Sequence, residues 1–304
     1  WRQGMVKLGA PPYRDAMRRL LLILLLLIAP PAFARPVHDR PALWKVSDAD
    51  TTIWLFGTIH MLGADHVWFE NKVAAAFGGA TELAVETRMP DAAEAQKIVL
   101  RHALDPAGTP LAGKLTPALN ERLAKRMAAV GLPIDRLQSA EPWYLAMLLE
   151  AITYQQYGLA SDNGVDVLLM AKAEAAGKAI VPLEAFEQQI SYLDDLPEPL
   201  QVAMLESTLD DIDGGRAYIA RLVRGWSKGD IAALARLMNA DFDRLAPLRD
   251  ILLDQRNARW ADWIAKRMDQ PGSVFLAVGA GHLGGRNNVR DLLEAKGLHV
   301  ERVQ

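Results

Sequence analysis

The sequence predicts a mixed α/β (α+β) fold whose central β-sheet is formed by the N- and C-terminal portions of the chain together. Short apolar runs punctuated by turn residues, the pattern of strands, occupy residues 43–86 and 273–303. Between them, apolar residues recur at intervals of three to four, which predicts mainly helices over about 91–178 and 185–270. We therefore expect one domain over residues 35–304, in which a large helical insertion interrupts the sheet.

The first 34 residues are expected to lie outside this domain. Residues 17–34 combine two arginines, a short apolar core and the small-residue pattern Ala32-x-Ala34, as a cleavable secretory signal does. The apolar core is shorter than the roughly 20 residues of a permanent bilayer-spanning helix. An uncleaved anchor or a buried helix is the alternative. We expect residues 1–16 to be untranslated or disordered, translation to start at Met17, and a periplasmic or secreted protein without a permanent membrane anchor.

Composition excludes several kinds of chemistry. The chain has no cysteine, which removes disulfides, thiolate nucleophiles and cysteine-type metal sites. The net charge is -3 and the basic residues are dispersed, so no nucleic-acid partner is expected. Metal binding is therefore left to histidine, aspartate and glutamate.

Turn signals and hydrophobic periodicity place the individual elements. Polar residues 47–50 are typical of a hairpin turn. Gly78 and Gly79 end the first helix, because glycine is the commonest residue just after a helix. The run SVFLAVG at 273–279 is almost wholly apolar, so we expect a strand buried on both faces. The expected order is strands at 43–46 and 51–56, a helix at 68–80, a strand at 81–86, helices including 119–131, 141–158 and 163–178, a strand at 179–184, further helices to 270, and strands at 273–279 and 298–303.

Four of the apolar strands lead to polar residues that can bind metal or move protons. These residues are His60, Glu86, Glu184 and His282. In open α/β sheets, binding sites form outside the carboxyl ends of the strands. If the four strands share one sheet and run the same way, the four side chains converge. Two imidazoles with one or two carboxylates suit zinc, manganese or cobalt.

Each of these residues also has a structural interpretation. A single histidine after a strand is more often a surface or packing residue than a ligand, and histidine has many roles. Glu86 and Glu184 could each be a carboxylate at the start of a helix, stabilised by the helix dipole. The repeated spelling Gly-x-x-His, in GTIH and GAGH, favours a shared function. We expect its glycine to let the chain turn sharply after the strand and approach a ligand closely.

Two further motifs are weaker. GAGHLG spells the dinucleotide fingerprint Gly-x-Gly-x-x-Gly, with Glu301 20 residues past Gly281, but the further strand–helix units of that fold do not follow it.

The stretch LLDQRNARWADWI reads as a helix. Arg256 and Asn257 could face the site, as an anion stabiliser and a hydrogen-bonding partner. Alternatively they lie on a solvated face, and the buried stripe consists of Trp260, Trp263 and Ile264.

These motifs, in this order, resemble the TraB/PrgY/GumN family of bacterial proteins, relatives of the animal Tiki proteases. The resemblance runs from LWKV to HVERV and includes LAVE, GKAIVPLEAFEQQ, QRNARW and VGAGHLGGRNNVRDLLEAKGLHV. Together with the export signal it looks most like the secreted GumN-type branch. It implies a mixed α/β fold similar to erythromycin-esterase-like and ChaN-like proteins. LGGRNN departs from the Leu-Pro-Gly type of continuation expected after the second histidine.

The resemblance also implies a chemistry, since the Tiki branch is similar in motifs and performs metal-dependent proteolysis with manganese or cobalt favoured. The matching residues are His60 and His282 for the two motif histidines, Glu86 for the motif glutamate, and Arg256 and Asn257 for the Arg-Asn pair; Glu184 lies in a family-like stretch.

The leading hypothesis is a metal-dependent hydrolase, most simply a peptidase acting on a peptide or protein. His60 and His282, with Glu86 and Glu184 as carboxylate donors, would bind a divalent ion, Mn, Co or Zn. Glu86 would be a ligand or the general base, and Arg256 or Asn257 would stabilise the oxyanion. Two alternatives stay open. One is a metal-free, esterase-like hydrolase with a histidine base, and the other is a binding protein for a peptide, haem or a polysaccharide precursor.

Overall fold

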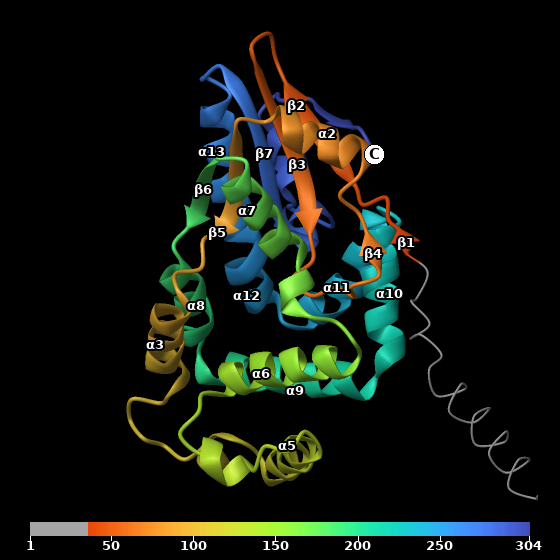
Figure 1. Cartoon of the computed structure of the whole chain (residues 1–304). Helices are drawn as coiled ribbons and strands as arrows, with labels where there is room; N and C mark the ends of the chain where they lie inside the picture. The colour runs from red at the N-terminus through yellow and green to blue at the C-terminus, as the bar shows by residue number, and fades with distance from the viewer. Residues whose placement is uncertain (1–35) are drawn as a thin grey trace, which may run out of the picture. The chain divides into compact units, whose positions relative to one another are not determined.

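The computed structural model describes residues 36–304, apart from the side chains of residues 238–244. The predicted signal at 17–34 lies outside the described residues. A six-stranded sheet has the order β6-β5-β7-β3-β2-β8 (Figure 1). Its strands are β2 (Leu43–Ser47), β3 (Thr51–Thr58), β5 (Glu82–Thr87), β6 (Ala179–Glu184), β7 (Gly272–Gly279) and β8 (Val300–Arg302). Two shorter strands, β1 (Val37–His38) and β4 (His66–Val67), lie outside that sheet.

The direction of the strands matters more for function than their number. β3 pairs in parallel with β7, β7 with β5, and β5 with β6, whereas β2 and β8 form the antiparallel edge. The four strands that lead to the candidate site residues are therefore consecutive and run the same way. Figure 1 shows their ends facing the helices α6 and α9. The predicted mixed α/β fold, with a sheet built from both ends of the chain, is confirmed.

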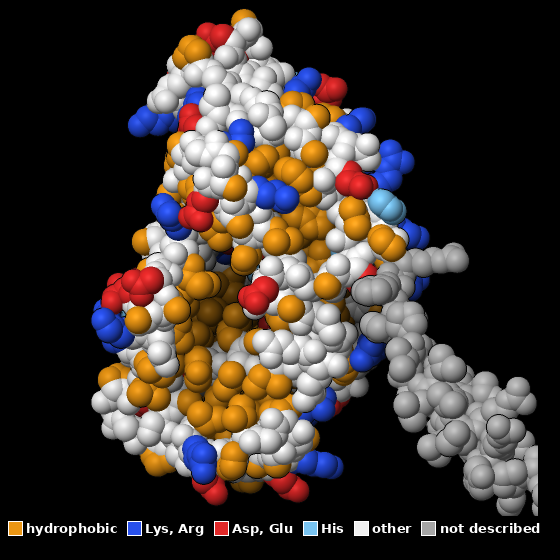
Figure 2. Space-filling view, in the orientation of Figure 1, with side chains coloured by type: hydrophobic (Ala, Val, Ile, Leu, Met, Phe, Trp, Pro, Cys, Tyr) orange, Lys and Arg blue, Asp and Glu red, His pale blue; other side chains and the backbone are white. Residues whose placement is uncertain are grey.

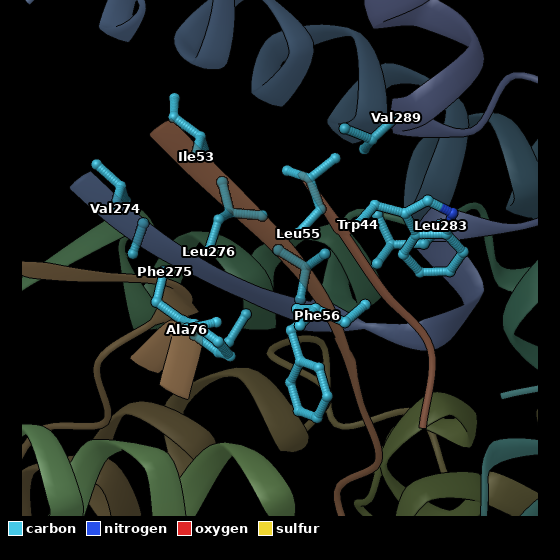
Figure 3. Packing of buried hydrophobic residues seen from close by; sticks show 14 of the residues in the cluster. Trp44, Ile53, Leu55, Phe56, Ala76, Val274, Phe275, Leu276, Leu283 and Val289 are labelled. Carbon is cyan, nitrogen blue, oxygen red and sulfur yellow. The ribbon is translucent and has the colours of Figure 1, made fainter. Parts of the chain in front are cut away.

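Alternation of side chains explains why the central strands are buried on both faces. Ile53 and Leu55 of β3 pair in register with Val274 and Leu276 of β7, and Phe275 points to the opposite face (Figure 3). All five side chains are buried. A strand covered on both faces needs a nearly continuous apolar run, which is what β3 and β7 contain.

Helices cover the sheet and form a separate layer beyond the strand ends. Their bounds are α2 (Asn71–Gly79), α3 (Ala92–Ala103), α4 (Leu111–Lys114), α5 (Pro117–Ala129), α6 (Pro142–Gln156), α7 (Val165–Ala175), α8 (Phe186–Asp194), α9 (Glu198–Asp213), α10 (Arg216–Ser227), α11 (Ile231–Arg244), α12 (Ala246–Arg249), α13 (Gln255–Arg267) and α14 (Val289–Ala295). A π-helical turn, Asp250–Asp254, joins α12 to α13. No helix within residues 36–304 combines the length and apolarity needed to cross a membrane.

The helical layer has a hydrophobic core of its own. Leu123 of α5, Leu149 of α6 and Leu205 of α9 are fully buried and belong to a cluster distinct from the one around the sheet. A buried lysine, Lys114, adds an ion pair to Asp105 within this layer at 2.6 Å. The position of α6 is therefore held by packing that is independent of the strands.

The glycine of the first Gly-x-x-His motif does not turn the chain, contrary to the sequence-based expectation. Gly57 lies inside β3 and pairs with Val278, and the strand continues to Thr58. A Cβ at Gly57 would lie 3.1 Å from the Cα of Ala280, tighter than most such contacts. The glycine therefore permits close approach of the two motif segments to each other.

Candidate functional site

The parallel strands deliver the four predicted residues to the same end of the sheet. His60 follows β3, Glu86 lies near the end of β5 and Glu184 ends β6. His282 lies in a short 3₁₀ segment, Ala280–Leu283, directly after β7. Because the register pairs Thr58 with Gly279, the two motif segments leave the sheet side by side.

Arg256 occupies the centre of this region. Its Nη2 donates to Oε2 of Glu86 at 2.7 Å, and its Nε donates to Oε2 of Glu184 at 3.0 Å. Its Nη1 donates to the carbonyl of Leu252 at 3.1 Å and to Nε2 of His282 at 3.2 Å. All three guanidinium nitrogens are therefore engaged. Arg256 links two carboxylates, at the ends of β5 and β6, with one imidazole that directly follows β7.

The inward orientation of Arg256 and Asn257 answers a question that helical spacing left open. Both side chains are buried, on the same face of α13 as Trp260 and Ile264, whereas Trp263 is only half-buried. The π-helical turn just before α13 offers a local explanation, because an extra residue in a turn rotates all following side chains about the helix axis.

His282 is held in one tautomer. Its Nδ1 lies 2.6 Å from Oδ1 of Asn257, whose Nδ2 donates to the carbonyl of Asn287 at 2.9 Å. Because the amide nitrogen of Asn257 is committed as a donor, its oxygen must accept, so Nδ1 of His282 carries the proton. Nε2 therefore presents a lone pair. The ring also packs against Trp260, with ring centroids 4.4 Å apart.

Burial and neighbouring charge set opposite protonation states within this group. Burial, reinforced by the positive charges of Arg256 and His60 and opposed by Glu86, lowers the pKa of His282 to about 3. Burial acts to raise the pKa of Glu86. In acid, where His282 is also protonated, its charge and those of Arg256 and His60, with the N–H of Gly279 at 2.6 Å from Oε1, nevertheless lower the pKa of Glu86 to about 2. At neutral pH the imidazole is neutral and the carboxylate is ionised.

His60 is held by a different element. Its Nδ1 lies 3.2 Å from Oδ2 of Asp166 on α7. A Cβ at Gly164, which precedes α7, would lie 2.4 Å from the carbonyl of His60, so this approach requires glycine. Burial, which would lower the pKa of His60, is outweighed by the hydrogen bond and charge of Asp166 and the charges of Glu86 and Glu150, which raise it to about 9.

These groups line a cavity of about 490 Å³ between the strand ends and the helical layer. The strand side contributes His60, Glu86 and His282, and Arg256 joins them from α13. Helices α6 and α10 contribute mainly apolar side chains, including Met147, Leu222 and Trp226. Figure 2 shows a hollow in this region with hydrophobic side chains gathered around it. The arrangement, an apolar cavity with a few convergent polar groups, is typical of small-molecule or peptide binding sites.

Two predicted residues lie behind the cavity. Glu184 is not among the lining residues, and its carboxylate is bound by Arg256, Arg259, Gln189 and Tyr192. Asn257 contacts His282 and the backbone and is likewise outside the lining. Glu184 therefore contacts Arg256, and Asn257 contacts His282, from outside the cavity.

Sequence reasoning missed several partners of the site. Asp166 gives no sequence signal beyond being an acidic residue in the first turn of a helix, which is common for electrostatic reasons. Gln189 donates to Oε2 of Glu86 at 3.2 Å. It belongs to the quoted stretch GKAIVPLEAFEQQ, so the motif contained it without indicating its role.

The donor chemistry fits a divalent ion in one respect and is incomplete in another. Both imidazoles have Nδ1 fixed by an outer oxygen, Asp166 for His60 and Asn257 for His282, which is how metal-binding histidines are commonly oriented. Within the part of the chain that the structure describes, however, no three histidine, aspartate or glutamate side chains are gathered as a ready metal site.

Comparison with known proteins agrees with the motifs. The TraB/PrgY/gumN family matches residues 42–302, almost all of the described chain. The chain belongs to this family. "Uncharacterized protein YbaP" of Escherichia coli (strain K12) is 27% identical over 256 residues, covering 84% of this chain and 93% of that protein. No solved structure matches the chain.

Two other relatives have an activity in their names. "Metalloprotease TIKI homolog" of Amphimedon queenslandica is 23% identical, covering 86% of this chain and 61% of that protein. "Metalloprotease TIKI2" of Danio rerio is 25% identical, covering 82% of this chain and 58% of that protein. The chain thus spans about three fifths of the length of these two animal proteins.

Proposed function

We propose that the chain is a metal-dependent hydrolase that cleaves peptides. The observation that carries this proposal is the matched setting of His60 and His282. Each has Nδ1 occupied by an outer oxygen, and both side chains line the cavity that also contains Glu86. His60 and His282 would hold the ion through Nε2, with Glu86 as a carboxylate donor. At His282 the ion would replace the hydrogen bond that Nε2 accepts from Arg256. We propose Mn, Co or Zn, which accept such a ligand set.

The protonation states support this assignment over a metal-free histidine base. A bound divalent ion lowers the pKa of its water ligand from 15.7 to roughly 7. A general base works best with a pKa near the operating pH. His282 lies far below that range and His60 above it. A metal ligand must be neutral, and His282 already is; His60 must lose its proton on binding the ion.

Arg256, Asn257 and Glu184 then have distinct roles. Arg256 lines the cavity, but all of its nitrogens are engaged. To donate a hydrogen bond to a substrate oxygen, Arg256 would therefore have to release one of its present partners. Of its contacts to cavity-lining side chains, the one to His282 is the longest, at 3.2 Å. Asn257 fixes the tautomer of His282, and Glu184 fixes Arg256. We assign the last two as positioning residues.

The test compares peptide cleavage by the chain after chelation and after addition of Mn, Co or Zn. His60→Ala and His282→Ala are expected to remove cleavage and weaken metal binding, measured by elemental analysis. His299→Ala is the matched control, because this side chain is 85% exposed and is not among the residues that line the cavity. Full cleavage and metal content in both site variants would refute the proposal. No cleavage with any metal would favour the binding-protein alternative.

A further inference from the structure

The cavity has a second polar region, away from the strand ends. Glu150 and Tyr154 of α6 and Tyr218 of α10 line the main cavity on its helical side. The same three residues also line an adjoining chamber of about 80 Å³. This region contributes to none of the contacts of Arg256 and His282 described above, so the proposed function leaves it without a role.

Glu150 is a carboxylate without a lysine or arginine partner among the described residues. It accepts a hydrogen bond from the Tyr154 hydroxyl at 2.6 Å. Burial raises its pKa, and the hydrogen bond from Tyr154 and the charge of His60 only partly oppose this. Among the residues that the structure describes, no lysine or arginine is ion-paired with Glu150. A carboxylate partly removed from water without a cation is unfavourable, and a bound positive charge would relieve that cost.

We propose that Glu150 determines substrate specificity by binding a primary ammonium group, of a peptide N-terminus or a lysine side chain. This inference rests on the proposed function, since it concerns the same cavity. The hydrocarbon next to the ammonium would lie against the apolar wall that includes Met147, Leu222 and Trp226. Tyr154 lines both the main cavity and the adjoining chamber, and its hydroxyl orients the Glu150 carboxylate.

The position of His60 links this region to the candidate reaction site. His60, Glu86 and Glu150 line the same cavity, and the charges of both carboxylates raise the pKa of the His60 imidazole. An ammonium bound at Glu150 would therefore hold the neighbouring peptide bonds near the strand-end groups. Ammonium recognition would select which bond enters the reaction site, without taking part in the reaction.

The test uses three five-residue alanine peptides with amidated C-termini. The first has a central lysine and an acetylated N-terminus, the second has norleucine in place of the lysine, and the third has norleucine and a free N-terminus. Binding to the full chain, stripped of metal, is measured by isothermal titration calorimetry, so the result does not depend on cleavage. We expect one or both ammonium-bearing peptides to bind about tenfold more tightly than the blocked norleucine peptide, as for a charge-assisted hydrogen bond. The two arms identify which ammonium is recognised.

Glu150→Gln keeps the shape of the side chain and is expected to abolish the preference. Glu206→Gln is the matched control, because it removes one negative charge from an exposed position on the neighbouring α9. Thermal unfolding of both variants checks the fold. Equal binding of the three peptides to the unmodified protein, or no binding of any, overturns the inference, as does a Glu150→Gln variant that keeps the preference. Ammonium preference without cleavage defeats only the proposed function; cleavage without ammonium preference defeats only this inference.

Discussion

The two Gly-x-x-His segments follow neighbouring parallel strands but place their imidazoles in opposite surroundings. His282 is 5% exposed, packed on Trp260 and hydrogen bonded at both ring nitrogens. The His60 side chain is 68% accessible to solvent, although the protein atoms around the cavity it lines partly desolvate it, and it is held through Nδ1 only, by Asp166. One histidine has a pKa of about 3 and the other about 9.

The difference shows that the motif specifies position and the surrounding helices specify chemistry. α13 supplies Arg256, Asn257 and Trp260, which make the His282 half rigid and neutral. α7 supplies one carboxylate, Asp166, which keeps the solvent-accessible His60 cationic. If the comparison is correct, substitutions in the His282 half should affect stability strongly, and those in the His60 half should mainly affect protonation.

The largest effect is expected for Arg256→Met. This change leaves Glu86 and Glu184 buried without their shared cation, and breaking such a buried pair costs about 3–5 kcal/mol. The free energy of unfolding, measured by urea denaturation, should fall by that amount. Arg259→Met is the control, because this side chain also contacts Glu184 but is 45% exposed, and we expect a loss below about 1 kcal/mol. Similar losses in the two variants would contradict the central role of Arg256.

Acid destabilisation comes next, and His282 should dominate it. In the unfolded chain His282 takes up a proton near pH 6.5, and in the folded protein only near pH 3. Between these values the unfolded state binds more protons, so the free energy of unfolding falls as the pH is lowered from 6.5. From pH 6.5 to 4 the loss should be about 3 kcal/mol. Glu86 adds its own loss only below its ordinary pKa of 4.5.

The pH profile also separates the two histidines. His282→Gln should flatten the slope between pH 6.5 and 4, measured by urea denaturation at each pH. His60 has the opposite sign, because its raised pKa gives stability that is present below pH 6.5 and lost as the pH rises towards 9. Its exposure to solvent makes that effect smaller. An unchanged acid slope in His282→Gln would show that other groups carry it.

The sequence predicted the strand ends well because parallel strands obey a simple geometric rule. An apolar run followed by a polar residue, repeated four times, was sufficient to bring His60, Glu86, Glu184 and His282 to one edge. It could not show that Glu184 lies behind Arg256, because that depends on where α13 packs. Nor could it reveal Asp166, which reaches His60 across 106 residues of chain through a contact that no local pattern encodes. The role of Gly57 was predicted wrongly, because close packing and turning both call for glycine.

A smaller loss of stability is expected for Asn257→Ala. The change leaves the buried Nδ1–H of His282 without its acceptor, which costs about 1–3 kcal/mol. Asn120→Ala is the control, because Oδ1 of Asn120 is buried and has no partner among the described residues. Urea denaturation should show a clear loss for Asn257→Ala and little for Asn120→Ala. Equal losses would mean that the His282 tautomer is not fixed by Asn257.

The smallest effect on stability is expected for Asp166→Asn, which nevertheless tests the His60 half directly. The amide keeps the shape of the side chain and removes the charge that stabilises the imidazolium. The pKa of His60 should therefore fall from about 9 towards 6.5 or below, because desolvation, which lowers this pKa, is then opposed by fewer charges. A histidine NMR titration, with His60→Gln to assign the resonance, measures it. The pKa of His282 should stay low, because its causes are burial, Arg256 and the remaining charge of His60. An unchanged His60 titration would mean that Glu86 and Glu150, rather than Asp166 of α7, set the protonation state of His60. The charges of the two halves of the site would then not be independent.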